Sequence, residues 1–288
     1  MKPPLFQGAC TALVTPFLNG KINLSMLSKL IQRQITAGIH SFVLCGTTGE
    51  APTLSDQEKL AIFSYAKEQF PSQMIICGTG SNATHHAMAM SRAAEDAGAD
   101  ALLVVTPYYN KTSPSGLIAH FSAVAACVHI PIILYNVPGR TGVDIPVAVY
   151  QELSQIPNIA GVKEASTDIT KIAKIKAACP RDFSVWSGND DMTVPIMSLG
   201  GDGVISVTSN VAPLEMQDMC LAALAGDFDT AAQLQLTLLP LMNALFSDVN
   251  PIPVKAAMNL LGYDCGECRL PLSQLSSDKL KTLVSLLT

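Results

Sequence analysis

The sequence has little charge, and the charge it has is dispersed. Asp, Glu, Lys and Arg make up 14% of the 288 residues, and the formal net charge is −5. No run of basic residues and no alternation of basic and aromatic residues occurs, so nucleic acid and anionic membranes are poor partners. Hydrophobic residues make up 49%, which leaves too little charge to cover the surface of a monomer. We therefore expect a homo-oligomer.

Long apolar runs are also missing. The longest apolar stretch, residues 236–246, contains Pro240 and is too short to cross a bilayer. The first residues, Met1-Lys-Pro-Pro-Leu5, contain no apolar signal region. We expect a cytoplasmic protein that does not enter the membrane.

Histidine and cysteine do not gather in metal-binding patterns. The five histidines, at positions 40, 85, 86, 120 and 129, form no set of three ligands. Most of the eight cysteines lie in apolar segments, where cysteine acts as a small hydrophobe. Only Cys265-Gly-Glu-Cys268 has a metal or redox spacing, and no second pair or nearby histidine completes a zinc site. We expect inert thiols, no disulfide framework, no metal and no organic cofactor.

Short runs rich in Val, Ile and Leu recur along the first three quarters of the chain. They cover residues 9–15, 41–45, 74–78, 101–106, 130–136, 160–164, 183–187 and 203–208. Segments with apolar residues at helical spacing lie between them, for example residues 24–37, 56–69, 84–97 and 168–178. Ser55 is a candidate N-cap, and Gly38 and Gly98 stand where helices should end.

Eight apolar strands that alternate with helices predict an α/β fold, the (β/α)8 TIM barrel. An open doubly wound sheet is the alternative. It requires a glycine-rich dinucleotide fingerprint after the first strand, where this chain reads Val14-Thr-Pro-Phe-Leu-Asn-Gly20. We therefore favour the barrel.

The strand pattern stops near residue 225. Three helical patterns follow, at residues 228–247, 253–261 and 272–287, and no flexible linker precedes them. We predict a barrel over residues 1–225 and a C-terminal three-helix extension over residues 226–288, packed on the barrel.

One predicted strand carries a lysine at its far end, in Asn158-Ile-Ala-Gly-Val-Lys-Glu-Ala-Ser166. A buried ammonium is costly unless it is paired or its pKa falls. Active sites of barrels lie at the C-terminal ends of the strands, and a neutral lysine there attacks a carbonyl to form a Schiff base. The alternative role of Lys163 is an ion pair with a buried carboxylate, for which Glu164 and Glu50 are the candidates.

Other strand ends carry groups that suit anionic substrates. Gly46-Thr-Thr-Gly-Glu50 offers closely spaced N–H groups and hydroxyls to a carboxylate, although a plain turn has the same composition. Arg140 lies between Pro138-Gly139 and Thr141-Gly142, on a loop rigid enough to present its guanidinium to a second carboxylate; a surface arginine is the alternative. A Schiff-base enzyme also needs a proton shuttle, and the candidates are Tyr135, Tyr108, Tyr109, Thr47 and Thr48.

Five motifs in order, each at a strand end or in the extension, resemble the pyruvate-dependent class I aldolase superfamily and, within it, the dihydrodipicolinate synthase family. They are Gly46-Thr-Thr-Gly-Glu50, Thr106-Pro-Tyr-Tyr-Asn110, Tyr135-Asn-Val-Pro-Gly-Arg-Thr-Gly142, Gly161-Val-Lys-Glu-Ala-Ser166 and Asn250-Pro-Ile-Pro-Val-Lys255. The resemblance covers almost the whole chain. It implies an enzyme of diaminopimelate and lysine biosynthesis that condenses pyruvate with L-aspartate 4-semialdehyde.

The same resemblance implies a pyruvate site. Lys163 forms the Schiff base with pyruvate, and Thr47 and Thr48 hold its carboxylate. The main chain of Ile205 lies close to the bound pyruvate, and Gly188 belongs to the substrate-binding residues.

It also implies a proton relay and a second substrate site. Tyr135 is the general acid and base, linked through Thr48 to Tyr109, which reaches in from the neighbouring subunit. Arg140 binds the carboxylate of the semialdehyde. The expected assembly is a homotetramer, a dimer of dimers.

Two other functions remain open at this point. Sugar-acid and sialic acid aldolases resemble the chain at Lys163, Tyr135 and the Gly46–Glu50 motif, but differ after the fifth strand, where Arg140 suits a substrate with a second carboxylate. A non-catalytic paralogue that binds a keto acid would share the pocket without turnover.

One departure from the family bears on regulation. Lysine-inhibited relatives have histidines at the positions of Asp56 and Lys59 and a glutamate at the position of His86. Asn82 and Tyr108 remain, but the carboxylate that would bind a lysine ammonium is missing. We expect inhibition by L-lysine to be weak or absent.

Overall fold

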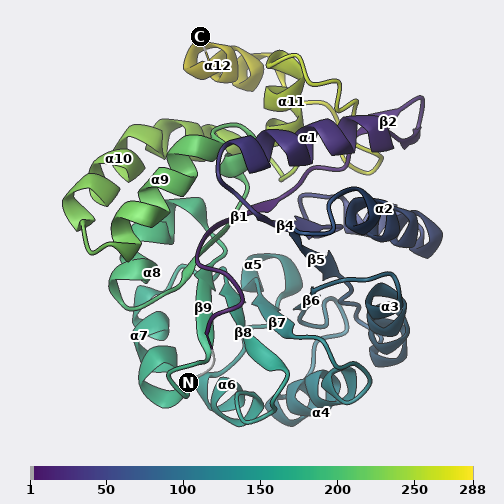
Figure 1. Ribbon diagram of the computed structural model, residues 1–288, viewed down its shortest axis with the longest axis vertical. Coiled ribbons are helices and arrows are strands. Elements are labelled where there is room, and N and C mark those ends of the chain that lie inside the picture. The colour runs from purple at the N-terminus through teal and green to yellow at the C-terminus, as the bar shows by residue number, and fades with distance from the viewer. Residues whose placement is uncertain (1–2, 288) are drawn as a thin grey trace.

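The computed structural model describes residues 3–287. Eight parallel strands of this described part form a closed barrel, in which each strand pairs with the next along the chain and β1 closes the ring between β10 and β4 (Figure 1). They are β1 Gly8–Ala12, β4 Ser41–Leu44, β5 Met74–Gly78, β6 Ala101–Val105, β7 Ile132–Asn136, β8 Ile159–Glu164, β9 Ser184–Ser187 and β10 Gly203–Ser206. The predicted (β/α)8 barrel is confirmed.

Helices surround the barrel on its outside (Figure 1). They are α1 Leu24–Thr36, α2 Asp56–Gln69, α3 Thr84–Asp96, α4 Pro114–Ala125, α6 Val147–Leu153, α7 Ile169–Ala178, α8 Thr193–Ser198 and α9 Pro213–Leu224. The predicted caps are present. Ser55 and Glu58 form a reciprocal capping box at the start of α2. Gly38 and Gly98 follow α1 and α3 with φ angles of +82° and +90°, a conformation that glycine adopts at little cost.

Short elements in the loops were not predicted. The strands β2 Phe17–Leu18 and β3 Lys21–Ile22 form a hairpin around Asn19 and Gly20, both with positive φ. An Asn-Gly pair between apolar residues is a hairpin signal, so this element was readable from the sequence. The 3₁₀ turns η1 Ala51–Thr53, η2 Asp190–Met192 and η3 Thr208–Asn210 have no comparable signal.

The hydrophobic core has two layers. A large outer layer fills the space between strands and helices, and a smaller one fills the barrel interior, where Tyr135, Trp186, Ile205 and Cys10 pack together. Phe6 stacks on Trp186 with ring centres 4.7 Å apart, and its carbonyl accepts a hydrogen bond from the indole N–H. The N-terminal segment therefore contributes to the packing inside the barrel.

Three helices follow the barrel: α10 Phe228–Leu245, α11 Ile252–Leu260 and α12 Ser277–Leu287. In Figure 1, α10 lies along α9, whereas α11 and α12 lie beyond α1. The predicted helical extension is confirmed, although its third helix begins five residues later than expected, at Ser277. Within the described residues, none of the helices combines the length and the apolar character that a membrane crossing requires.

Candidate active site

Lys163 lies inside the barrel near the C-terminal end of β8. It pairs in register with Tyr135 on β7 and with Trp186 on β9, and it is 5% exposed. Successive residues of a strand face opposite sides, so Lys163 points into the barrel while Glu164 faces the helices. The carboxylate of Glu164 accordingly accepts a hydrogen bond from Tyr150 of α6 at 2.8 Å.

Both carboxylates considered as partners of Lys163 are occupied by other lysines. Glu164 lies 3.6 Å from the Nζ of Lys171, and Glu50 lies 2.7 Å from the Nζ of Lys255. In the part of the chain that the structure describes, no carboxylate lies within ion-pair distance of Lys163. Its Nζ lies instead 4.5 Å from the centre of the Tyr135 ring. The ion-pair alternative does not hold.

Uncharged side chains surround this amine. Tyr135, Trp186 and Ile205 belong to the same interior cluster as Cys10. Burial raises the pKa of the Cys10 thiol, and the charge of Lys163 acts in the opposite direction. Cys10 therefore stays a neutral thiol and is not a counter-ion for Lys163.

Gly188 follows β9 next to the end of β8. Its N–H donates to the carbonyl of Glu164 at 2.7 Å, and a Cβ at this position would lie 2.6 Å from the Cβ of Ala165. A larger residue would push the two strand ends apart beside Lys163.

The segment Gly46–Glu50 forms a strained loop after β4. Cys45 and Glu50 stand at its two ends with φ angles of 51° and 57°, the left-handed region that non-glycine residues rarely adopt. Thr48 is buried and Thr47 is half-buried. Within the described residues, the N–H groups of Thr47 and Thr48 donate to no acceptor, so both remain available to an anion.

Residues of the C-terminal extension form hydrogen bonds with this loop. The carboxylate of Glu50 accepts hydrogen bonds from Lys255 at 2.7 Å and from the backbone N–H of Arg269 at 2.8 Å. Asn250 donates through Nδ2 to the hydroxyl of Thr48 at 3.0 Å. Asn250, Lys255 and Arg269 were not predicted as residues of the site. The only signal was the motif that runs from Asn250 to Lys255.

Within the described part of one chain, the residues of the predicted proton relay, Tyr135, Thr48 and Tyr109, make no hydrogen bonds with one another. Tyr135 is 6% exposed and lies beside Lys163, whereas Tyr109 is 92% exposed on the loop between β6 and α4. Tyr109 has a φ of 70°, so this loop is strained as well. Among the described residues, the hydrogen bond of Thr48 is made with Asn250 and not with either tyrosine.

A cavity of about 470 Å³ opens at the mouth of the barrel. Thr47, Tyr135 and Arg140 contribute to its lining, together with Cys45, Gly46, Gly78, Leu103, Val105, Tyr108, Val137 and Thr141. Lys163 is not a lining residue, but the ring of Tyr135, over which its amine lies, is one. Arg140 is exposed on the single-turn helix α5 Pro138–Thr141, and its Nη2 lies 3.4 Å from the carbonyl of Asn250.

The outer part of the same cavity holds Asp56, Lys59 and His86. His86 contacts the carboxylate of Asp56 at 2.9 Å, and the Nζ of Lys59 lies 3.8 Å from it. Asp56 is the acidic residue among those that line this cavity, and it already has two partners. A cationic ligand would have to compete with them.

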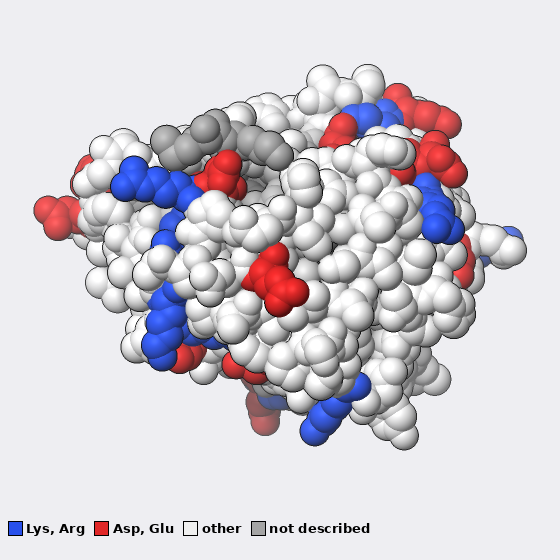
Figure 2. Space-filling view, turned by 90° about the horizontal axis from the view of Figure 1, so that it is seen from below, with Lys and Arg blue, Asp and Glu red and all other residues white. Residues whose placement is uncertain are grey.

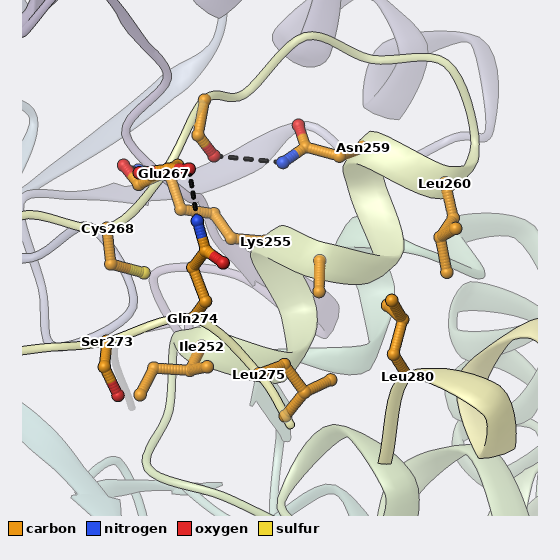
Figure 3. Close-up of a pocket in the computed structure, with 12 residues that line it drawn as sticks. Ile252, Lys255, Asn259, Leu260, Glu267, Cys268, Ser273, Gln274, Leu275 and Leu280 are labelled. Carbon is orange, nitrogen blue, oxygen red and sulfur yellow. Dashed lines mark hydrogen bonds between the residues drawn. The ribbon is translucent and has the colours of Figure 1, made fainter. Parts of the chain in front are cut away.

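A second cavity, of about 360 Å³, lies within the extension, between α11, α12 and the segment before α12 (Figure 3). None of the predicted site residues lines it, but Lys255 does. The thiol of Cys268 also faces this region, and burial raises its pKa to about 12, as it does for Cys265. All eight cysteines are free.

A closed parallel barrel with a buried, unpaired amine at its mouth defines a class of protein, the (β/α)8 enzymes that attach a carbonyl substrate to a lysine. The comparisons with known proteins narrow this class. Residues 5–288 match the model of the dihydrodipicolinate synthetase family. The chain belongs to that family.

Relatives and solved structures agree over nearly full length. The chain is 47% identical to the 4-hydroxy-tetrahydrodipicolinate synthase of Acetivibrio thermocellus, over 98% of this chain and 97% of the relative. It is similar to a dihydrodipicolinate synthase of Acinetobacter baumannii crystallised with pyruvate, with a TM-score of 0.96, 42% identity and 98% of both chains covered. A structure described as a monomeric dihydrodipicolinate synthase variant also gives a TM-score of 0.96, with 40% identity, over 98% of this chain and 96% of the other.

Proposed function

We propose that this chain acts as a 4-hydroxy-tetrahydrodipicolinate synthase, a Schiff-base-forming lyase that condenses pyruvate with L-aspartate 4-semialdehyde. One observation supports this most directly. Lys163 is buried at the mouth of the barrel, and the two carboxylates predicted as its alternative partners, Glu164 and Glu50, are bound by Lys171 and Lys255. An amine without a carboxylate partner in an apolar site is the form of lysine that can attack a carbonyl.

The first half of the reaction uses the loop after β4. The amine of Lys163 attacks the keto carbon of pyruvate, and loss of water from the carbinolamine leaves the Schiff base. The free N–H groups of Thr47 and Thr48 bind the pyruvate carboxylate, since closely spaced backbone donors form a site for an anion. Loss of a methyl proton then gives the enamine, and Tyr135 is placed beside the amine to carry protons.

The second half of the reaction uses Arg140, which also lines the cavity. The enamine carbon attacks the aldehyde of the semialdehyde, whose carboxylate Arg140 binds. The amine of this substrate then displaces Lys163 by transimination and closes the ring, which returns the free lysine. The exposed Arg140 at the cavity rim supports a substrate with a second carboxylate over the polyol of a sugar acid.

We also propose that the active unit is an oligomer, a homotetramer built as a dimer of dimers. Tyr109 is 92% exposed in one chain, as expected for a residue that completes the site of a neighbour. Figure 2 shows a face on which uncharged side chains cover most of the surface, in keeping with the low content of charged residues. The eight free thiols are consistent with the cytoplasm as the working compartment.

Trapping of the covalent intermediate tests the proposal. Reduction with borohydride in the presence of pyruvate should add one reduced pyruvate to the peptide that contains Lys163. The equally buried Lys171 and Lys255 are internal controls and should remain unmodified, because each amine is already bound to a carboxylate and neither lies inside the barrel. Lys163→Arg should abolish both the adduct and product formation from pyruvate and the semialdehyde. An unmodified Lys163, under conditions that trap another Schiff-base enzyme, would disprove the mechanism.

A further inference from the structure

Asn250 connects the two sites proposed for the substrate carboxylates. Its side chain donates through Nδ2 to the hydroxyl oxygen of Thr48 at 3.0 Å, and its backbone carbonyl lies 3.4 Å from Nη2 of Arg140. Asn250 lies just before α11, about 200 positions further along the chain than Thr48, and it is 6% exposed. A single residue of the C-terminal extension thus contacts both walls of the barrel mouth.

In the hydrogen bond between Asn250 and Thr48, the hydroxyl oxygen of Thr48 is the acceptor. A hydroxyl has one proton to donate and two lone pairs that accept. Because the amide of Asn250 occupies a lone pair of Thr48, the hydroxyl proton is left for another acceptor. A pyruvate carboxylate bound at the free N–H groups of Thr47 and Thr48 would be such an acceptor.

The amide oxygen of Asn250, Oδ1, is buried and has no hydrogen-bond donor in the described part of the chain. An unsatisfied buried polar atom destabilises the fold, and an apolar residue of similar size would avoid that penalty. The amide is therefore better explained by what its Nδ2 does for Thr48 than by stability.

We infer that Asn250 is a positioning residue for the pyruvate site: its amide directs the hydroxyl proton of Thr48 towards the pyruvate carboxylate, while its carbonyl holds Arg140. This inference rests on the proposed function and deepens it. The side chain of Asn250 acts on the pyruvate site through Thr48, whereas its backbone carbonyl contacts Arg140. A change of side chain should therefore affect the two substrates unequally.

Steady-state kinetics with both substrates varied tests this. Asn250→Ala should raise the KM for pyruvate about 10- to 100-fold, the effect of one lost hydrogen bond in a site for a charged group, and should change the KM for the semialdehyde much less. Asn250→Asp keeps the size of the side chain but can only accept. It should be worse than Asn250→Ala, because its carboxylate captures the Thr48 proton and repels pyruvate.

A double-mutant cycle with Thr48→Val shows whether the effect passes through the hydroxyl. The fraction of chain trapped by borohydride at a series of pyruvate concentrations measures pyruvate binding without turnover. In the Thr48→Val background, Asn250→Ala should change this binding by less than about 3-fold. Asn158→Ala is the control, since Asn158 also donates from its amide, but to the carbonyls of Ala125 and Val128 away from the mouth, and neither KM should change.

The outcomes separate this inference from the proposed function. If the wild-type chain forms no pyruvate adduct, both are overturned. If it is active but the effects of Thr48→Val and Asn250→Ala multiply, or the two KM values rise equally, the positioning role alone is overturned. Should Asn250→Ala fail to fold, the nearly isosteric Asn250→Asp still tests whether the KM for pyruvate rises more than the KM for the semialdehyde, and equal rises would overturn the positioning role.

Discussion

Replacement of Lys255 by methionine should cost about 3–5 kcal/mol of unfolding free energy, the usual result of removing one partner of a buried ion pair. The side chains of Lys255 and Glu50 are 2% and 0% exposed, and their charged atoms lie 2.7 Å apart. Without the ammonium, the carboxylate of Glu50 keeps the backbone N–H of Arg269 as a donor but no cation. This charge would have to stay buried unpaired or take up a proton.

The loss of unfolding free energy can be expressed as a decrease in the melting temperature, Tm. Unfolding entropy is about 2.1 cal/mol/K per residue, so for 288 residues a loss of about 4 kcal/mol lowers Tm by about 7 °C. The double variant Glu50→Gln with Lys255→Met removes both charges. It should recover more than half of this loss, since buried ion pairs are replaced by neutral side chains at little net cost.

Thermal and urea unfolding followed by circular dichroism measure these values. The control is Lys279→Ala, which removes a pair with Asp248 of similar length, 2.6 Å, between side chains that are 38% and 30% exposed. Surface pairs contribute about 0–1 kcal/mol, so this variant should unfold almost as the wild type does. If Lys255→Met also lies within 1 kcal/mol of the wild type, or the double variant is less stable than the single one, the buried pair does not anchor the loop.

Three further predictions concern catalysis, regulation and acid stability. Tyr109→Phe should lower kcat at least 10-fold with little change in Tm, because the side chain of Tyr109 is 92% exposed in the single chain. The activity of the wild type should fall on dilution at the concentrations where sedimentation shows dissociation, and an isolated monomer with full activity would refute the shared site. L-lysine should inhibit weakly or not at all, because Asp56 is already bound by His86, and strong inhibition at low millimolar concentration in a steady-state assay would contradict this. The guanidinium of Arg269 lowers the pKa of Glu58 from its ordinary value of 4.5 to about 2. This carboxylate therefore contributes stability above pH 4.5, and the contribution is lost as the pH falls towards 2. In Glu58→Gln, the free energy of unfolding should depend less on pH between 4.5 and 2.

The barrel could be predicted because its signals are local. Each strand is an apolar run bounded by turn residues, and each helix has its own apolar face and caps, as Ser55 and Gly38 show. The strand predicted at residues 9–15 ends at Ala12 instead, because Thr15 leaves the sheet and donates its hydroxyl to the carbonyl of Gly49. That contact joins separate loops, and no local pattern encodes it. The domain boundary at residue 225 stays a prediction.

The position of Lys163 could also be predicted, but its surroundings could not. Sequence order puts Glu164 next to it, yet strand alternation turns that carboxylate to the other face of the barrel. Glu50 lies in the loop after β4, four strands away from β8 in the barrel, and its partner Lys255 comes from a helix 205 positions away. Ion pairs between residues so far apart in the sequence depend on how the C-terminal extension packs on the barrel, and the hydrophobic pattern does not specify that packing. The roles of Tyr109 and Arg140 remain predictions that rest on family resemblance.

Three buried lysines of this chain have different surroundings, and the difference bears on the reaction proposed for Lys163. Lys163, Lys171 and Lys255 are 5%, 6% and 1% exposed, so burial does not distinguish them. Lys171 and Lys255 lie outside the barrel, where each forms an ion pair with a buried carboxylate. Lys163 lies inside, between Tyr135 and Trp186 of the adjacent strands, and the cavity opens beside Tyr135. The proposed chemistry therefore depends on the side of the strand that the lysine occupies. A shift of one residue in the register of β8 would put the carboxylate of Glu164 at the position proposed for the reacting amine.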